Sequence, residues 1–199
     1  MALAALVLIG MWLLVAVGAR TVVQFRRTGN TEIRVRDRPG TAQWWAKTIS
    51  TVGFLGIVAA PIAELVGLEP FPVLDAQPIR GAGAALAVVG IALTFVSQLG
   101  MGASWRADVD PGVRTALVTT GPFRWVRNPV LTGVAATFSG LALLVPNAVA
   151  LGGLVFAVVA IEIQVRQVEE PYLRSAHGAA YGDYAARTGR FLPLLGRQR

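Results

Sequence analysis

The stretch GPFRWVRNPVLTG, residues 121–133, places two arginines, an asparagine and two prolines directly before a run of apolar residues. Pro129 suits the first turn of a helix, because the N–H that proline lacks has no helical partner there. The apolar run continues over 130–145, and after a Pro-Asn pair at 146–147 a second apolar run covers 148–165. The pattern predicts two antiparallel helices joined by a tight turn.

The rest of the chain is equally apolar. Of its 199 residues, 54% are hydrophobic and only 15% are charged, and the mean hydropathy is +0.58. These values exclude an ordinary soluble domain. Five segments approach the length that crosses a bilayer: 2–19, 42–67, 79–101, 130–145 and 148–165. We therefore expect an all-α, polytopic membrane helical bundle of about five transmembrane helices, with Pro61 and Glu64 making the end of the second uncertain.

Composition also limits the chemistry. The chain has no cysteine, which excludes disulfides, iron–sulfur clusters and thiol catalysis. Its single histidine, His177, cannot build a usual transition-metal site, so no metal is expected. The net charge of +7 is not carried by a soluble basic domain with interleaved aromatic residues, which disfavours binding to nucleic acid.

The basic residues predict an orientation. In a five-span arrangement, all of the 18 basic residues except Arg80 fall on one side, in the segments 20–47, 102–128 and 166–199. The positive-inside rule then places these segments in the cytoplasm and the N-terminus outside, in what we expect to be a bacterial plasma membrane. Arg124 and Arg127 are expected at the level of the lipid headgroups.

Two groups of polar and small residues interrupt the apolar segments. The glycines and alanines of GAGAAL, residues 81–86, are best explained by close helix packing, as are Gly133, Thr137 and Gly140. After the fifth segment, α-helical spacing places four residues on one face: Glu162, Arg166, Glu169 and Leu173. Arg166 can pair with Glu162 or with Glu170 at a spacing of four. Such pairs serve either as simple interfacial ion pairs or as part of a site.

Two longer motifs carry a resemblance. TALVTTGPFRWVRNPVLTG (115–133) and RQVEEPYLRSAHGAAYGDYAARTGRFLP (166–193), with MGASWR (101–106) as a weaker element, resemble the isoprenylcysteine carboxyl methyltransferase family and its phospholipid methyltransferase relatives. Members are multi-pass membrane enzymes that use S-adenosylmethionine. The resemblance covers about residues 100–193, and the first two apolar segments carry no signature of the family. We expect a catalytic half over 102–199 that ends in a cap, and three transmembrane helices with a basic loop over 1–101.

The family motif implies particular site residues. Cofactor binding is expected from Leu117, Val118, Phe123, Asn128, Pro129, Leu131, Glu169 and Glu170. Asn128 stands where the family more often has histidine, and it cannot titrate near neutral pH, although it can cap the following helix. Leu131 stands where tyrosine is frequent. Glu169 is expected to accept hydrogen bonds from the ribose, and Arg166 to orient an anionic group of the acceptor or of the cofactor.

The function implied is methyl transfer from S-adenosylmethionine to a lipidic or prenyl-type acceptor that enters from the bilayer. A carboxylate acceptor is favoured, because it is already ionised at neutral pH and needs no catalytic base. The alternatives are a phospholipid N-methyltransferase, a small-thiol S-methyltransferase, or a lipid-binding or transport protein without catalysis. The polar C-terminal tail is expected to form a short amphipathic helix and a loop that roof the cofactor site.

Overall fold

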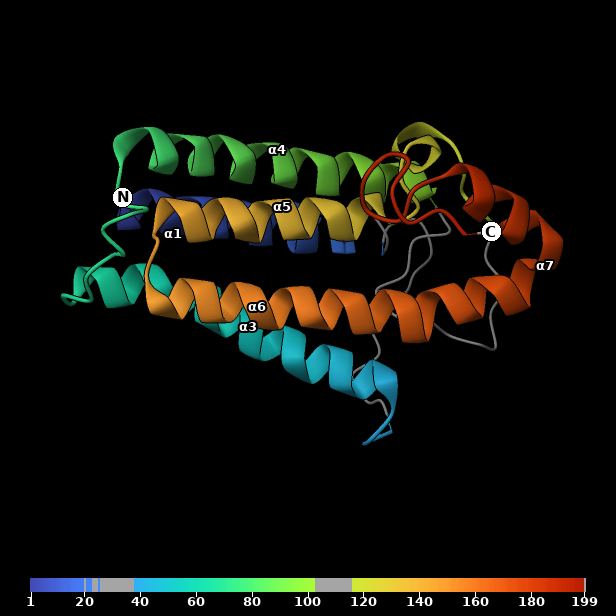
Figure 1. Cartoon of the computed structure of the whole chain (residues 1–199), viewed down its shortest axis with the longest axis horizontal. Helices are drawn as coiled ribbons and strands as arrows, with labels where there is room; N and C mark the ends of the chain where they lie inside the picture. The colour runs from blue at the N-terminus through green and yellow to red at the C-terminus, as the bar shows by residue number, and fades with distance from the viewer. Residues whose placement is uncertain (20, 23–24, 26–37, 103–115, 199) are drawn as a thin grey trace.

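The computed structural model describes residues 1–19, 21–22, 25, 38–102 and 116–198. Within these ranges the ordered elements are helices (Figure 1), with one isolated β-bridge between Val126 and Gly189. The elements are α1 (Ala2–Trp12), a π-helical continuation η1 (Leu13–Ala19), α3 (Ala42–Leu65), α4 (Gln77–Met101), a 3-10 turn η3 (Gly121–Arg124), α5 (Pro129–Leu144), α6 (Ala148–Ile163), a π-helix η4 (Gln164–Glu169) and α7 (Glu170–Arg187).

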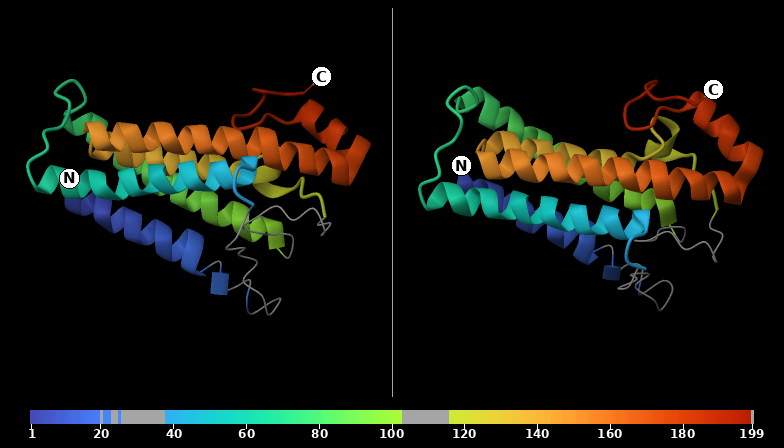
Figure 2. Two further views of the ribbon diagram at one scale, coloured as in Figure 1. Left: turned by 90° about the horizontal axis from the view of Figure 1, so that it is seen from below. Right: turned by 60° about the horizontal axis from the view of Figure 1, so that its bottom comes forward.

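The predicted helical membrane bundle is confirmed. Within the described ranges, three helices are long and apolar enough to cross a membrane, namely α3, α4 and the 40-residue helical stretch Ala148–Arg187, of which α6 is the apolar part. The shorter apolar helices Ala2–Ala16 and Pro129–Leu144 lie alongside them (Figure 2). Pro61 does not end α3, which continues to Leu65. The chain is therefore an integral membrane protein.

The bundle has two different ends (Figure 1). The N-terminus, the connection 66–76 and the turn at 145–147 lie at one end, which we call the far side. Residues 38–41, 116–128 and 164–198 lie at the other, which we call the cap side. The described basic residues all belong to the cap-side half except Arg80, as the charge pattern predicted. The basic residues at 20, 26, 27, 34, 36, 106, 114 and 199 lie outside the described ranges.

Arg80 is buried at the far side by a set of partners. Its Nε donates to Asp75 Oδ1 at 2.6 Å, and its Nη1 donates to Glu64 Oε1 and to the Leu144 carbonyl oxygen, both at 3.2 Å. The N-terminal ammonium lies 3.8 Å from Glu64 Oε1. The pairing explains how Glu64 sits at the end of an apolar helix: its charge is neutralised rather than left in the membrane.

Small residues let α4 and α5 pack with their backbones in contact. A Cβ added to Gly83 would lie 2.7 Å from the Gly140 carbonyl oxygen, and one added to Gly133 would lie 2.7 Å from the Thr94 nitrogen. The same holds between α3 and α6, where a Cβ on Gly53 would lie 2.7 Å from the Ala157 nitrogen. The prediction that small residues serve helix packing is confirmed for Gly83, Gly133 and Gly140 but is wrong for Gly81, where nothing lies within 4 Å of an added Cβ. The tight pairs fix α5 against α4.

Candidate active site

The start of α5 is covered by the C-terminal segment of the chain. The Arg127 N–H donates to the Gly189 carbonyl oxygen at 2.7 Å, and the Asn128 N–H donates to the Arg190 carbonyl oxygen at 3.1 Å. The Asn128 side chain makes no capping hydrogen bond and donates instead to the same Arg190 oxygen at 3.2 Å. The interpretation of Asn128 as a side-chain cap is therefore wrong, because the C-terminal backbone binds its amide.

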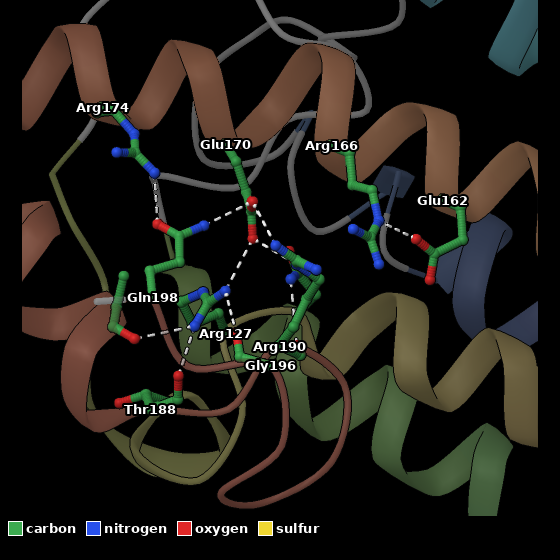
Figure 3. A network of polar contacts seen from close by, with 11 residues as sticks. Arg127, Glu162, Arg166, Glu170, Arg174, Thr188, Arg190, Gly196 and Gln198 are labelled. Atoms are coloured by element: carbon green, nitrogen blue, oxygen red, sulfur yellow. Dashed lines mark hydrogen bonds and ion pairs between the residues drawn. The ribbon is translucent and has the colours of Figure 1, made fainter.

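Both oxygens of the Glu170 carboxylate are engaged (Figure 3). Arg127 Nη2 donates to Oε1 at 2.9 Å, and Arg190 donates from Nε to Oε1 at 2.8 Å and from Nη2 to Oε2 at 3.0 Å. Gln198 Nε2 donates to Oε2 at 2.8 Å. The carboxylate thus joins the start of α7 to the start of α5 and to both ends of the C-terminal segment. We call Glu170, Arg127, Arg190 and Gln198 the Glu170 hub.

Arg127 is buried inside the protein, and its expected position at the level of the lipid headgroups stays a prediction. Only 1% of its side chain is exposed, and Nη1 donates to the carbonyl oxygens of Ala185 at 3.1 Å and Thr188 at 2.5 Å. A buried guanidinium needs such partners, since its desolvation is otherwise very costly. Burial alone would raise the pKa of Glu170, but hydrogen bonds from Arg190 and Arg127 outweigh it and hold that pKa below its usual value. Arg124, by contrast, is exposed and lies over the Trp125 ring.

The helix that leaves the membrane has a different register from the one expected. Glu162, Arg166, Glu170 and Arg174 project toward the C-terminal segment from one side of the helix (Figure 3). The cause is η4, because π-helical hydrogen bonds span five residues and add residues to each turn. The prediction that Glu169 and Leu173 share the face of Arg166 is therefore wrong. The predicted Glu162–Arg166 ion pair is present, whereas Glu170 pairs with Arg127 and Arg190.

Glu169 lies in η4, beyond the apolar part of the helix, and has a separate environment. Gln164 Nε2 donates to Glu169 Oε1 at 3.2 Å, a spacing of five residues that fits the π-helix. Desolvation raises the pKa of Glu169 to about 7; the hydrogen bond from Gln164 opposes this rise, and the neighbouring Glu170 charge adds to it. A carboxyl that titrates near neutral pH at the edge of a membrane is a candidate functional group.

The cap packs two tyrosines onto the segment before α5. Tyr184 donates its hydroxyl to the Phe123 carbonyl oxygen at 2.6 Å, and Phe123 is buried. Tyr181 is also buried, and both tyrosines pack with Leu117. A break from helical geometry at Gly178, where φ is 52°, lets α7 bend toward this segment. The predicted C-terminal helix and loop are thus present and fold back over the bundle. That they roof a cofactor site stays a prediction.

A groove of about 300 Å³ opens between α5 and α6 on the cap-side half. It is lined by Thr132, Ala135, Ala136, Ser139, Val158, Ile161, Glu162, Phe191 and Leu192. The lining is mostly apolar, and Glu162, whose partner is Arg166, is its ionisable residue. A groove with this lining fits a hydrocarbon chain with a polar end at Glu162.

The structure brings some of the predicted site residues together. Leu117 and Phe123 lie under α7, and Asn128 and Glu170 share Arg190 as a partner. Pro129 is buried at the start of α5; Val118 and Leu131 are partly buried. Arg166 and Glu169 have their own partners, Glu162 and Gln164, and no hydrogen bond in the described ranges joins either of them to this group.

Sequence reasoning missed the role of Arg190, Gln198 and Tyr184. Each donates a hydrogen bond to a residue that is distant along the chain. Arg190 and Gln198 donate to Glu170, 20 and 28 residues away, and Tyr184 donates to Phe123, 61 residues away. The available signal was the density of arginine and tyrosine in a tail too polar to cross the membrane and too patterned for disorder. It indicated a folded cap and could not indicate the partners.

The family model described as phospholipid methyltransferase matches residues 79–180, half of the chain, from α4 into α7. Among solved structures, the chain is similar to the eukaryotic intramembrane Ras methyltransferase ICMT (isoprenylcysteine carboxyl methyltransferase), with a TM-score of 0.62 and 22% sequence identity, over 91% of this chain and 62% of that one. At this identity the likeness shows the fold, and the chain spans less than two thirds of that protein's length. A search of curated proteins gives no match. The chain belongs to the phospholipid methyltransferase family, and it is a methyltransferase of the membrane with an ICMT-like helical fold.

Proposed function

We propose that the protein transfers a methyl group from S-adenosylmethionine to a lipidic acceptor at the cap side of the membrane. The observation that carries this proposal is the α5–α6 groove. It is apolar along membrane helices, ends at the Glu162–Arg166 pair, and is bordered by the C-terminal segment that also covers the start of α5. A hydrocarbon chain in this groove would present its polar end close to the segment that carries the predicted cofactor residues.

The residues of the cap side fit a polar, zwitterionic cofactor. Arg127 Nε, in the Glu170 hub, and the Tyr181 hydroxyl are buried and have no hydrogen-bond partner among the residues that the structure describes. The α5 N-terminus has no side-chain cap, and such a terminus favours an anionic group such as a carboxylate. Glu169 has a raised pKa and can accept hydrogen bonds from hydroxyl groups when ionised. Buried Phe123 and partly buried Leu117 offer apolar surface for an aromatic base.

The chemistry asks for alignment more than for acid–base groups. S-adenosylmethionine supplies a methyl group on a sulfonium, which is its own leaving group, so positioning of the reactants is the main requirement. In this proposal Glu169 binds the ribose hydroxyls, and Arg166 orients an anionic group of the acceptor. The backbone and side chains of Leu117, Val118, Asn128, Pro129 and Leu131 line the cofactor, while Glu170 orders the surrounding segments. The tyrosines of α7 exclude water from the side of Phe123.

A carboxylate is the favoured acceptor. It is ionised at neutral pH and needs no proton acceptor, and Arg166 is more than half exposed beside the groove, where it can exchange Glu162 for another carboxylate. The second candidate is a lipid amine. It is favoured by Glu162, the ionisable residue in the lining of the groove, because a carboxylate attracts an ammonium group, and by the description of the matched family.

We further propose that the cap side is cytoplasmic and the N-terminus external, in a bacterial plasma membrane. The support is the distribution of basic residues, which the positive-inside rule relates to orientation. In this arrangement residues 1–101 form a scaffold and residues 102–199 carry the catalytic half.

The proposed function is tested by methyl transfer in vitro. The purified protein is incubated with methyl-labelled S-adenosylmethionine and lipid extract, and the products are identified by mass spectrometry. A labelled lipid ester supports the carboxylate acceptor, and a labelled lipid amine supports the second candidate. Label that appears only in water-soluble products would contradict a lipidic acceptor. The Arg166→Gln variant should lose ester formation, whereas Arg187→Gln, on an exposed turn of α7, should retain it.

A further inference from the structure

The segment Phe191–Gly196, which we name the leucine loop, leaves three large apolar side chains uncovered. Leu192, Leu194 and Leu195 are 55%, 66% and 62% exposed. All three lie within four consecutive residues of the cap, outside the apolar membrane helices. Clustered exposure of large apolar side chains marks an interaction surface.

The backbone of the leucine loop is held in an unfavourable conformation. Leu194 has a φ of 70°, in the left-handed region that a leucine adopts only when its surroundings enforce it. The Arg190 N–H donates to the Leu195 carbonyl oxygen at 2.8 Å, which closes the loop at its base. Gly189 is part of the closure, because a Cβ there would lie 2.9 Å from both Leu194 N and Leu195 O. The exposed leucines are thus presented by a defined conformation.

The Glu170 hub fixes both ends of the leucine loop. Arg190 precedes the loop and Gln198 follows it, and both donate to the Glu170 carboxylate. Arg127 Nη2 also donates to the Gly196 carbonyl oxygen at 3.1 Å. A loop anchored at both ends to buried charged groups can carry exposed apolar side chains without collapsing onto the cap.

The surface of the leucine loop continues the lipid-facing surface of the bundle. Phe191 accepts a hydrogen bond on its carbonyl oxygen from Thr132 of α5 at 3.1 Å. Leu192 lines the α5–α6 groove together with Val158 of α6, which is 43% exposed on a membrane helix. The C-terminal segment turns back along the bundle at the cap-side end of α5 (Figure 1). Leu192 therefore lies beside exposed apolar surface of the membrane helices.

Other residues mark this level as the membrane interface. Trp44 and Trp45 begin α3 and Trp125 precedes α5, so three tryptophans lie at the cap-side end of the bundle. Tryptophan concentrates at the boundary between headgroups and acyl chains. Arg187 and Arg197, on either side of the leucine loop, are exposed. Such cations are attracted to anionic lipid headgroups.

We infer that the leucine loop docks into the boundary between headgroups and acyl chains of the cap-side leaflet, with Arg187 and Arg197 at the level of anionic headgroups. The partner is the lipid bilayer itself. Leucine side chains beside a lipid-facing groove fit acyl chains, and the flanking cations fit lipid phosphates. This surface would hold the cap against the membrane in the position that the Glu170 hub defines.

The absence of cysteine makes the test direct. Leu194→Cys and, in a second protein, Leu195→Cys are labelled with an environment-sensitive fluorophore and reconstituted into vesicles of phosphatidylcholine and phosphatidylglycerol. Val88→Cys, exposed on α4, serves as the lipid-facing control, and Ala180→Cys, exposed on α7, serves as the water-facing control. Quenching is measured with a nitroxide lipid labelled near its headgroup and with iodide in the water.

The expected result is that the nitroxide lipid lowers the fluorescence of both loop probes about twofold or more, as at a depth within the acyl boundary, while iodide quenches them less than the Ala180 probe. Quenching by iodide like that of the Ala180 probe would overturn the inference. Protection from both quenchers would also overturn it, because a protein surface would then cover the loop. The second cysteine position keeps the test decisive if labelling at Leu194 disturbs its left-handed backbone.

Discussion

Arg127 and Glu170 form a buried ion pair, with Nη2 2.9 Å from Oε1, that joins the residue preceding α5 by two positions to the first residue of α7. The side chains are 1% and 8% exposed. Forty-three residues and a helical hairpin separate the two along the chain. The pair therefore fixes the cap relative to the membrane helices.

Glu170→Gln should destabilise the cap strongly. Removing one charge of a buried pair leaves the other uncompensated and costs about 3–5 kcal/mol. Thermal unfolding in detergent, followed by near-ultraviolet circular dichroism of the tyrosines and tryptophans, measures the loss. Glu162→Gln is the matched control, because the exposed Glu162–Arg166 pair contributes at most about 1 kcal/mol. Equal destabilisation by the two variants would contradict the distinction between buried and exposed pairs.

The same contact predicts an acid sensitivity. The pKa of Glu170 is below its usual value in the folded protein, since the hydrogen bonds from Arg190 and Arg127 outweigh the effect of burial. A depressed pKa means that the carboxylate contributes stability above its unfolded pKa and that this contribution is lost as pH falls through the folded pKa. As the pH is lowered from 6, the unfolding temperature of the parent protein should therefore fall more steeply than that of Glu170→Gln. Parallel curves would contradict the expectation.

Glu169 should influence cofactor affinity in a pH-dependent way. With a pKa of about 7 it is mostly protonated at pH 6 and mostly ionised at pH 8. If the ionised form binds ribose hydroxyls, affinity for S-adenosylhomocysteine should rise about tenfold over this range. Glu169→Gln should bind about tenfold to a hundredfold more weakly at pH 8 and show little pH dependence, because a hydrogen bond to a charged group is lost. Calorimetric titration checks both; unchanged affinity in the variant would refute the assigned role.

Glu169→Gln should also stabilise the protein at pH 8. A raised pKa means that Glu169 contributes stability when protonated, and that this contribution is lost as pH rises through about 7. Removing the desolvated charge should therefore raise the unfolding temperature at pH 8 and have less effect at pH 5, with an upper limit of about 3 kcal/mol. A variant that is less stable at pH 8 would show that the carboxylate has favourable partners in the folded state.

Gly140→Ala should loosen the bundle. The added Cβ would lie 2.5 Å from the Gly83 carbonyl oxygen, so α4 and α5 must separate, at a cost of about 1–3 kcal/mol. Gly81→Ala is the control, since nothing lies within 4 Å of a Cβ there, and it should be neutral or stabilise α4 by up to about 1 kcal/mol. Thermal unfolding of the two variants in detergent makes the comparison. If Gly140→Ala were as stable as Gly81→Ala, the backbone contact would not support the packing.

Most of the fold could be predicted from the sequence, because hydropathy and turn residues act locally. The apolar runs 130–145 and 148–165 became α5 and α6 to within two residues, and their Pro-Asn turn is present. The register beyond α6 could not be predicted. The helix changes from α- to π-helical geometry in η4, and the extra residues in each turn rotate Glu169 away from the side of Arg166.

The candidate site could be predicted only in part from the sequence, because several contacts join residues that are distant along the chain. The family motif indicated the segment from Leu117 to Leu131 and the pair Glu169–Glu170, all of which lie at the cap side. The motif did not distinguish the two glutamates, which have different surroundings in the folded protein. Arg190 and Gln198 engage Glu170, while Glu169 contacts Gln164 nearby. Likewise, burial of Arg127 depends on carbonyl oxygens of Ala185 and Thr188 that no local pattern could indicate.

The central claim is that S-adenosylmethionine binds at the junction between the start of α5 and the cap. Hydrogen–deuterium exchange of the protein in lipid, with and without S-adenosylhomocysteine, tests it most directly, because bound ligand lowers local opening. Slower exchange is expected in peptides covering 117–131 and 164–198, and unchanged exchange is expected at the far side, in 66–76. Slower exchange confined to the far side, or no change at saturating ligand, would contradict it.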